Sequence, residues 1–270
     1  PIRQPPPIPG PFTDPDMNAI WAYNANLCAP RTDWEQLADI DCLETDPPHR
    51  RVAMRNLRLK PFWLGAEQKE MAGLWDKECF RRVRRADLPE GTRVFTTRFH
   101  YKIKRYSATA SLKSLKVRLV VQGHRMVEGT DYEQAFAPVP RSTVGSTVIS
   151  VAAANGLHLH ALDISQAFIQ SSWADLPEVV DTIYVTPPEG VEEDAGIVYE
   201  VLRPLYGIPS SARALHFSLA KWFKSEGFQQ AGFEESVFIR KAGGKYKSDI
   251  IASSHIDDIL CACADLDVLA

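Results

Sequence analysis

The chain has 270 residues, of which 45% are hydrophobic and 24% charged, and its formal net charge at pH 7 is −3. This composition is ordinary for a globular protein, and the length allows one large domain or two smaller ones. No run of about 18 apolar residues is present, which excludes a predicted membrane span, and the acidic total argues against a uniformly basic nucleic-acid-binding protein. Five cysteines without metal-ligand spacing predict reduced, buried thiols in an intracellular protein: Cys28, Cys42, Cys79, Cys261 and Cys263.

The first 60 residues lack helix or strand periodicity. Their opening sequence, PIRQPPPIPGPFTDP, is rich in proline, which favours an extended and unpacked chain. We therefore predict that residues 1–60 form a disordered linker and that order begins near Lys60. Helical spacing from Trp63 to Arg82 predicts an amphipathic helix packed on the domain. Its stripe comprises Trp63, Glu67, Met71, Leu74 and Trp75.

A basic segment follows, with nine Lys or Arg residues and no Asp or Glu in the 35 residues from Arg93 to Val127. Apolar and charged residues alternate in RVFTTRFHYKIKR and in KVRLVVQG, which is the period of half-buried strands. We predict a hairpin over 93–122 with one cationic face, formed by Lys102, Lys104, Lys116 and Arg118. A solvated charged face is the alternative, but the lack of acidic residues favours phosphate binding.

The remaining segments predict an irregular alternation of helices and strands. In chain order we expect a helix over 141–155 ended by Gly156, a strand running into a turn over 158–169, strands in 181–190 and 197–207, a helix over 212–228 ended by Gly227, and strands in 233–241 and 248–264. This order predicts an α+β fold with a mostly antiparallel sheet.

Three aspartates interrupt apolar segments of the sequence. Asp163 lies in Ala161–Ile164, and Asp257 and Asp258 lie in His255–Ile259. Helix capping would explain the first and a hairpin turn the other two, but the apolar flanks and the lack of Gly or Asn favour a strand–turn–strand with carboxylates at its tip. Burying such carboxylates is costly unless a cation compensates them. Two Mg²⁺ ions held by carboxylates serve phosphoryl transfer.

Six segments occur together in one order: KVRLVVQG, GTDYEQAFAPVPR, AANGLHLHALDISQAF, IYVTPPEG, LRPLYGI and HIDDIL. From near Trp63 onward, the chain resembles the reverse transcriptase domain of copia-type (Pseudoviridae-like) long-terminal-repeat retrotransposon Pol polyproteins. The resemblance implies a right-hand polymerase with fingers and palm in residues 61–270. It places the fingers hairpin in 93–122 and makes the palm a mostly antiparallel sheet flanked by helices. The thumb and ribonuclease H of the family are expected to lie outside these residues.

The resemblance also implies roles for individual residues. Asp163 and Asp257 would be the main metal ligands, assisted by Asp258 and by the backbone carbonyl of Ile164. Phe168 matches the aromatic steric gate that excludes a 2′-hydroxyl, although a core phenylalanine is the alternative. The incoming triphosphate would bind Lys116 and Arg118, and the nucleic-acid backbone would bind Lys102 and Lys104. Tyr132 and Phe136 of the GTDYEQAF segment are expected in the core.

Three positions depart from the family pattern. Ser210 stands where the family has a glutamine that contacts the incoming nucleotide. His255 replaces the aromatic residue before the paired aspartates, where nucleic acid lies, and Ser146 stands near an expected arginine. These departures leave open a second reading, a catalytically inactive remnant that at most binds nucleic acid. A two-metal nuclease or integrase is a third reading, which leaves Phe168 unexplained.

The implied reaction is the addition of deoxynucleotides (dNTPs) to a primer 3′-hydroxyl with release of pyrophosphate. The implied cofactor is Mg²⁺, or Mn²⁺ in its place. Expected partners are an RNA or DNA template with its primer, dNTPs, and the integrase and ribonuclease H of the polyprotein, and no membrane. The family's DNA integration cycle implies an intracellular location, in cytoplasmic particles and the nucleus.

Overall fold

The computed structural model describes residues 45–57, 59–105, 112–243 and 248–265. The fold is α+β, as predicted, and its described elements fall into two compact units. Unit 1 comprises the chain up to Arg125 together with residues 182–207, and unit 2 comprises residues 126–181 and those from Ile208 onward. Residues 1–44 of the predicted linker lie outside the described residues. The rest of that linker includes a short helix, α2 (Arg50–Ala53).

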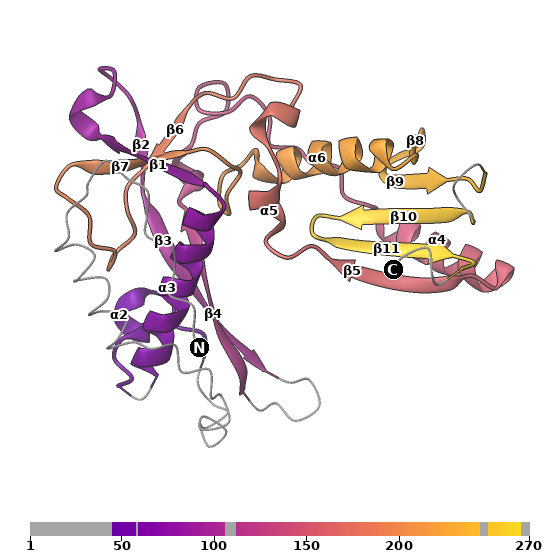
Figure 1. Ribbon diagram of the computed structural model, residues 1–270, viewed down its shortest axis with the longest axis horizontal. Helices are drawn as coiled ribbons and strands as arrows, with labels where there is room; N and C mark the ends of the chain where they lie inside the picture. The colour runs from indigo at the N-terminus through magenta and orange to yellow at the C-terminus, as the bar shows by residue number, and fades with distance from the viewer. Residues whose placement is uncertain (1–44, 58, 106–111, 244–247, 266–270) are drawn as a thin grey trace. The chain divides into compact units, whose positions relative to one another are not determined.

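Unit 1 contains a four-stranded sheet in the order β1-β7-β6-β2 (Figure 1). Its strands are β1 (Phe80–Arg84), β7 (Ile197–Val201), β6 (Ile183–Val185) and β2 (Val94–Phe95). Only the β2–β6 pair is parallel among these strands. A membrane-spanning helix is not found in the part of the chain that the structure describes.

The helix expected over 63–82 is shorter than predicted at its C-terminal end. Helix α3 (Lys60–Asp76) carries the expected stripe, with Trp63, Glu67, Met71 and Leu74 buried. Glu78 then takes a left-handed conformation, with φ 53°. The following residues form β1, whose Arg81 side chain bonds Glu200 on β7 at 2.8 Å. Pairing with a distant strand therefore ends the helical pattern.

The predicted hairpin consists of β3 (Thr97–Arg105) and β4 (Leu112–Val121), and residues 106–111 of its expected loop lie outside the described residues. Its apolar face is buried, with Phe99, Tyr101, Val117 and Leu119 at most 4% exposed. The register places His100 opposite Arg118 and Lys102 opposite Lys116. The cationic face predicted from alternation is therefore confirmed, because cross-strand partners share a face.

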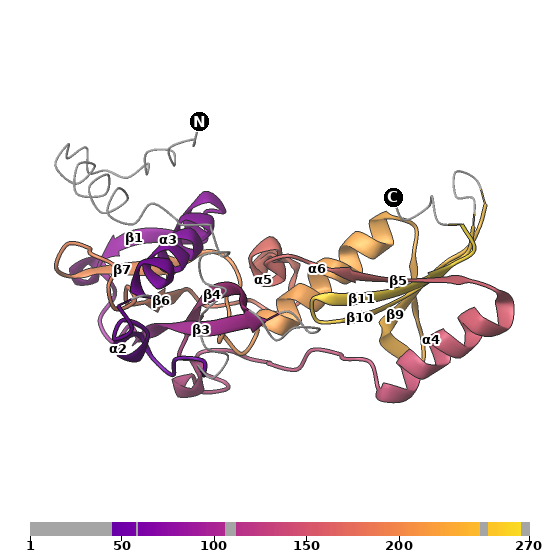
Figure 2. The ribbon, with the colours of Figure 1, turned by 90° about the horizontal axis from the view of Figure 1, so that it is seen from below.

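Unit 2 is built on an antiparallel sheet in the order β5-β11-β10-β9-β8. The strands are β5 (His158–Asp163), β11 (Asp258–Cys263), β10 (Ile250–His255), β9 (Glu234–Arg240) and β8 (Gln229–Ala231). Helices α6 (Ser211–Ser225) and α4 (Ser142–Asn155) lie on opposite faces of this sheet (Figure 2).

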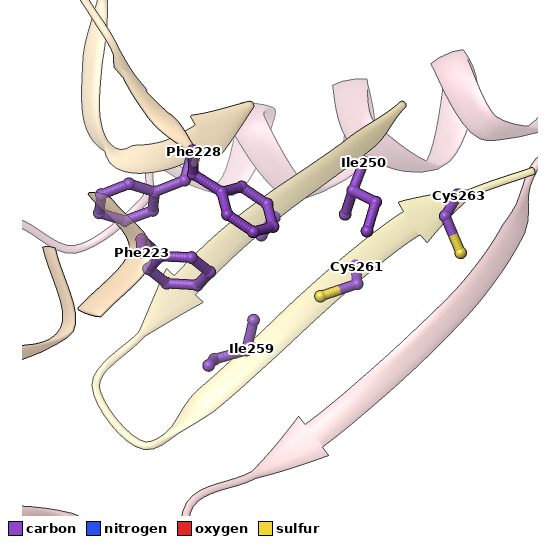
Figure 3. Packing of buried hydrophobic residues seen from close by; sticks show 8 residues of the cluster. Phe223, Phe228, Ile250, Ile259, Cys261 and Cys263 are labelled. Carbon is purple, nitrogen blue, oxygen red and sulfur yellow. The ribbon is translucent and has the colours of Figure 1, made fainter. Parts of the chain in front are cut away.

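Apolar packing fixes both helices of unit 2. Phe223 of α6 stacks on Phe238 with ring centroids 4.3 Å apart, and these rings join Ile259, Cys261 and Cys263 in one buried cluster (Figure 3). On the other face, Val148 and Ala152 of α4 pack against Ala262. As predicted, α4 ends at a left-handed glycine, Gly156, with φ 63°. Cys79, Cys261 and Cys263 are free and buried, whereas Cys28 and Cys42 lie outside the described residues.

Candidate active site

Two residues, Ile256 and Asp257, connect β10 to β11 in unit 2. The register pairs His255 with Asp258 directly across this turn. Ile256 adopts φ 58°, a left-handed conformation that is a genuine outlier for a β-branched side chain. The lack of Gly or Asn had argued against such a short turn, yet the turn forms because Ile256 takes the conformation that glycine would take. The predicted strand–turn–strand is present.

Backbone register brings two of the three aspartates side by side. Asp163, the last residue of β5, is paired with Asp258, the first residue of β11. His255 is paired with the same Asp258 from the other side. Paired residues project from the same face of a sheet, so the three side chains form one row across it. Asp257 stays in the turn, where its carbonyl accepts the Ile164 N–H at 2.9 Å.

None of these three carboxylates is fully buried. Asp163 and Asp258 are exposed and Asp257 is half-buried. The reason is the position of β5, which is the edge strand of its sheet and leaves Leu159 and Leu162 more than 40% exposed. The aspartates are thus held together by strand pairing and not by enclosure. Like charges directly opposite each other are destabilising, and a bound cation would offset that repulsion.

The aspartates offer hard carboxylate oxygens, which are the ligands that Mg²⁺ prefers. Register supplies two of them, and the backbone bond from Ile164 fixes the turn that carries the third. Within the described ranges, no three or more His, Cys, Asp or Glu side chains are arranged so that they could hold a metal ion. The donor chemistry therefore fits a divalent metal, while the side chains stand apart from a closed coordination shell.

Phe168 lies five residues after Asp163, on the short helix α5 (Ala167–Gln170). The connection turns sharply, because Gln166 adopts φ 54°. Phe168 is half-buried, with Ala167 and Ile169 fully buried beside it. Both core anchoring and contact with a ligand are compatible with this exposure.

Ser210, which precedes α6, is only 3% exposed, and its Oγ has no hydrogen-bond partner among the residues described. It lines a cavity of about 170 Å³ together with residues 129–134 and 178–181. The GTDYEQ segment, which was expected only to pack in the core, forms one wall of this cavity, and its Tyr132 is half-buried. Phe136, expected in the core, is instead 70% exposed. Nothing in its local pattern distinguished it from a core phenylalanine.

The cationic residues belong to unit 1. Lys102 Nζ forms an ion pair with Asp46 at 2.6 Å, and the other oxygen of Asp46 accepts the Ile103 N–H at 2.7 Å. Burial alone would raise the pKa of Asp46, but these two donors hold it below its ordinary value. Arg118 has its guanidinium carbon 5.0 Å from the centre of the Tyr206 ring. Asp46 and Tyr206 are partners that sequence reasoning missed.

Similar sequences are found among reverse transcriptases and retrotransposon Pol polyproteins. A family profile described as "Reverse transcriptase (RNA-dependent DNA polymerase)" matches residues 80–270. The retrovirus-related Pol polyprotein from transposon RE1 of Arabidopsis thaliana is 30% identical over 168 residues, which are 62% of this chain and 11% of that protein. The corresponding polyprotein from transposon TNT 1-94 of Nicotiana tabacum is 29% identical over 208 residues, 76% of this chain and 15% of its own length. The chain thus spans less than a sixth of these relatives.

Proposed function

Because the chain belongs to the reverse transcriptase (RNA-dependent DNA polymerase) family, with distant homology to copia-type retrotransposon Pol polyproteins over part of its length, we propose that it adds deoxynucleotides to a primer 3′-hydroxyl on an RNA or DNA template. The oxygen of that hydroxyl attacks the α-phosphorus of the incoming dNTP, a new phosphodiester bond forms, and pyrophosphate leaves. The pairing of Asp163 with Asp258, next to Asp257 in the turn, is the observation that carries this proposal.

The three aspartates hold the cations that this reaction needs. Asp163 and Asp257 are the main ligands, Asp258 assists them, and the Ile164 carbonyl adds a backbone oxygen. When bound, two Mg²⁺ or Mn²⁺ ions would favour ionisation of the 3′-hydroxyl and stabilise the leaving pyrophosphate. Asp163 and Asp258 are exposed, and Asp163 ends the edge strand β5, which supports access by a large substrate.

Other residues bind the incoming nucleotide. Lys116 and Arg118 contact its triphosphate, for which ammonium and guanidinium groups are natural partners. Phe168 acts as the steric gate against a 2′-hydroxyl, and Ser210 occupies the position of the family's nucleotide-contacting glutamine. The hairpin register is compatible with a polyanion ligand, because it sets Lys102 directly opposite Lys116 on one face, where a phosphate would compete with Asp46 for Lys102.

The nucleic acid lies along cationic and aromatic side chains. Lys102 and Lys104 contact the phosphate backbone, an interaction that weakens with added salt. His255, in the row of Asp163 and Asp258, contacts nucleic acid beside the reacting 3′ end. We assign the hairpin of 93–122 to the fingers and the antiparallel sheet with α4 and α6 to the palm, both within residues 61–270.

The rest of the Pol polyprotein would supply a thumb, ribonuclease H and integrase. The relatives are polyproteins several times longer than this chain, which supports such associated domains. As a retrotransposon protein, it would act inside the cell, in cytoplasmic particles and in the nucleus. DNA integration would then follow from the integrase and not from this chain.

Primer extension on a homopolymer template with Mg²⁺ or Mn²⁺ tests the proposal. Asp163→Asn is expected to lower extension by about a hundredfold or more, a loss typical when one electrostatic contact to the transition state is removed. Asp249→Asn is the matched control, because Asp249 pairs with Lys241 at the surface of the same unit. Strand cleavage that depends on Asp163 would instead support a nuclease.

A second function, binding nucleic acid without catalysis, is favoured by one observation. The short Ser210 side chain, buried and unpaired at Oγ within the described residues, replaces the glutamine amide that the family uses on the nucleotide. Salt-dependent binding of a primer–template without any extension would establish this function for the chain.

A further inference from the structure

The LRPLYG motif places an aromatic ring against a cation of the hairpin. The guanidinium carbon of Arg118 lies 5.0 Å from the ring centre of Tyr206, within the range of a cation–π contact. Arg118 is on β4 and Tyr206 follows β7, and both belong to unit 1. Both side chains are half-buried, so the contact is partly shielded from water and stronger than it would be on a fully exposed surface.

Backbone contacts fix the ring at this place. The Val121 N–H, at the end of β4, donates to the Tyr206 carbonyl at 2.8 Å. Gly207 then adopts φ 91°, and a Cβ added to it would lie 2.0 Å from the Val121 carbonyl oxygen. Leu205 anchors the other side of Tyr206, with 1% of its surface exposed. The three residues of the LYG sequence therefore serve one arrangement, in which Leu205 and Gly207 set the position of the ring.

A carboxylate adds to the environment of the same cation. Glu70 of α3 accepts the Leu119 N–H at 3.0 Å. Burial raises the pKa of Glu70, while that N–H and the positive charges of Arg118 and Lys116 act to lower it. Arg118 thus interacts with a ring that follows β7 and with a negative charge on α3, and across the hairpin it is paired with His100.

We propose that Tyr206 is a positioning residue that holds the Arg118 guanidinium ready for the triphosphate of an incoming dNTP. This inference rests on the proposed function, in which Arg118 binds that triphosphate. A free arginine side chain loses considerable rotamer freedom when it binds a ligand. The Tyr206 ring removes part of that freedom beforehand, and preorganisation of this kind raises affinity. The contribution belongs to nucleotide binding and leaves affinity for primer–template unchanged.

Equilibrium binding of dTTP with Mg²⁺ to the full chain tests this role. Tyr206→Leu is expected to weaken dTTP binding about 3- to 30-fold, the range of a cation–π contact, and Tyr206→Phe should restore it to within about twofold because the ring remains. Tyr184→Leu, at a half-buried tyrosine on β6 of the same unit, is the matched control and should bind normally. Thermal unfolding confirms that each variant is folded.

A double variant separates this inference from the function on which it rests. If Tyr206 acts through Arg118, Tyr206→Leu has no further effect on dTTP binding once Arg118→Ala is present. Full additivity of the two changes would overturn the positioning role, and so would a Tyr206→Leu variant that binds dTTP normally while Arg118→Ala does not. If Arg118→Ala itself leaves binding unchanged, the assignment of the triphosphate to Arg118 fails, and the role of Tyr206 fails with it.

Discussion

Ile256 shows how the turn of the aspartate hairpin stores strain. A side chain at φ 58° costs about 1–2 kcal/mol relative to glycine, and Ile256 recovers little of this by burial because it is 37% exposed. We predict that Ile256→Gly raises the free energy of unfolding by about 1 kcal/mol, measured by chemical denaturation. Ile149→Gly, at an exposed position within α4, should lower it by a similar amount. Equal losses in both variants would contradict the strain.

Asp46 forms an ion pair with Lys102, a residue that the proposed function assigns to the nucleic-acid backbone. It bonds both Lys102 and the Ile103 N–H, so it competes with a phosphate for the same donors. We predict that Asp46→Asn tightens primer–template binding about threefold or more at low salt and makes the salt dependence steeper by up to about 0.9 in logarithmic slope, the value of one phosphate contact. Fluorescence anisotropy at several salt concentrations measures both, and Asp249→Asn, at another surface ion pair, should change neither.

At the scale of single residues, the sequence predicted where the aspartates meet better than how exposed they are. The register of Asp163 with Asp258 agrees with the expectation that carboxylates meet at a hairpin tip. Their exposure was not predictable, because the apolar residues around Asp163 are typical of both buried and edge strands. Asp46 and Tyr206 were missed for a different reason. Each acts through a residue more than 50 positions away in the chain, and local pattern carries no sign of such partners.

At the scale of elements, alternation and periodicity predicted the hairpin, α4 and α6 well. These elements have strong internal patterns and glycine signals, such as Gly227 with φ 79° just after α6. The boundary between α3 and β1 was wrong because helical spacing continues beyond Asp76. There the ion pair of Arg81 with Glu200 and the pairing of β1 with β7 decide the structure, and both involve residues more than 100 positions apart.

Gly207 ties the hairpin element to the segment after β7. A Cβ here would meet the Val121 carbonyl oxygen at 2.0 Å, and the φ of 91° also disfavours any other residue. We predict that Gly207→Ala lowers the free energy of unfolding by more than about 2 kcal/mol, since backbone strain and a clash add. Gly145→Ala is the matched control, because a Cβ there has open space within α4. It should raise stability by up to about 1 kcal/mol; a similar response at both positions would contradict the close approach.

At the scale of the whole molecule, the chain leaves unit 1 after Arg125 and returns to it for residues 182–207. The family motifs are therefore divided between the two units. KVRLVVQG and LRPLYG belong to unit 1, and the aspartate segments belong to unit 2. The order of these motifs can be read from the sequence, but their division between the two units cannot. The division depends on pairings such as β1 with β7 and β5 with β11, which join segments far apart in sequence.

The groups that respond first to acid differ between the units: a histidine with a lowered pKa in unit 2, and two glutamates with raised pKa values in unit 1. In unit 2, hydrogen bonds from Lys221 and Ser218 lower the pKa of Asp175. A hydrogen bond from Arg213 lowers the pKa of Glu178. Burial lowers the pKa of His216, although the negative charge of Glu235 acts to raise it. In unit 1, burial raises the pKa of Glu67 and Glu70, whereas that of Asp46 is lowered. The response to acid should therefore differ between the units.

The sign of each response follows from which state binds protons first. Below an ordinary pKa of about 6.5, unfolded His216 is protonated before folded His216, so unit 2 loses stability as the pH falls from 7. It loses more below about pH 4, where Asp175 and Glu178 are protonated first in the unfolded chain. Glu67 and Glu70 do the reverse. They take up protons first in the folded state, so unit 1 gains stability as the pH falls through their raised pKa values.

We therefore predict that unit 2 opens before unit 1 as the pH is lowered from 7 to about 4.5, the window between the ordinary pKa values of histidine and glutamate. Hydrogen exchange measured by mass spectrometry gives protection factors, corrected for intrinsic rates, for β10 and β11 in unit 2 and for β3 and β4 in unit 1. His216→Leu should remove the loss in unit 2 above about pH 5.5, because the buried imidazole whose pKa is lowered on folding is then absent. Parallel loss of protection in both units, or no effect of His216→Leu, would contradict this account.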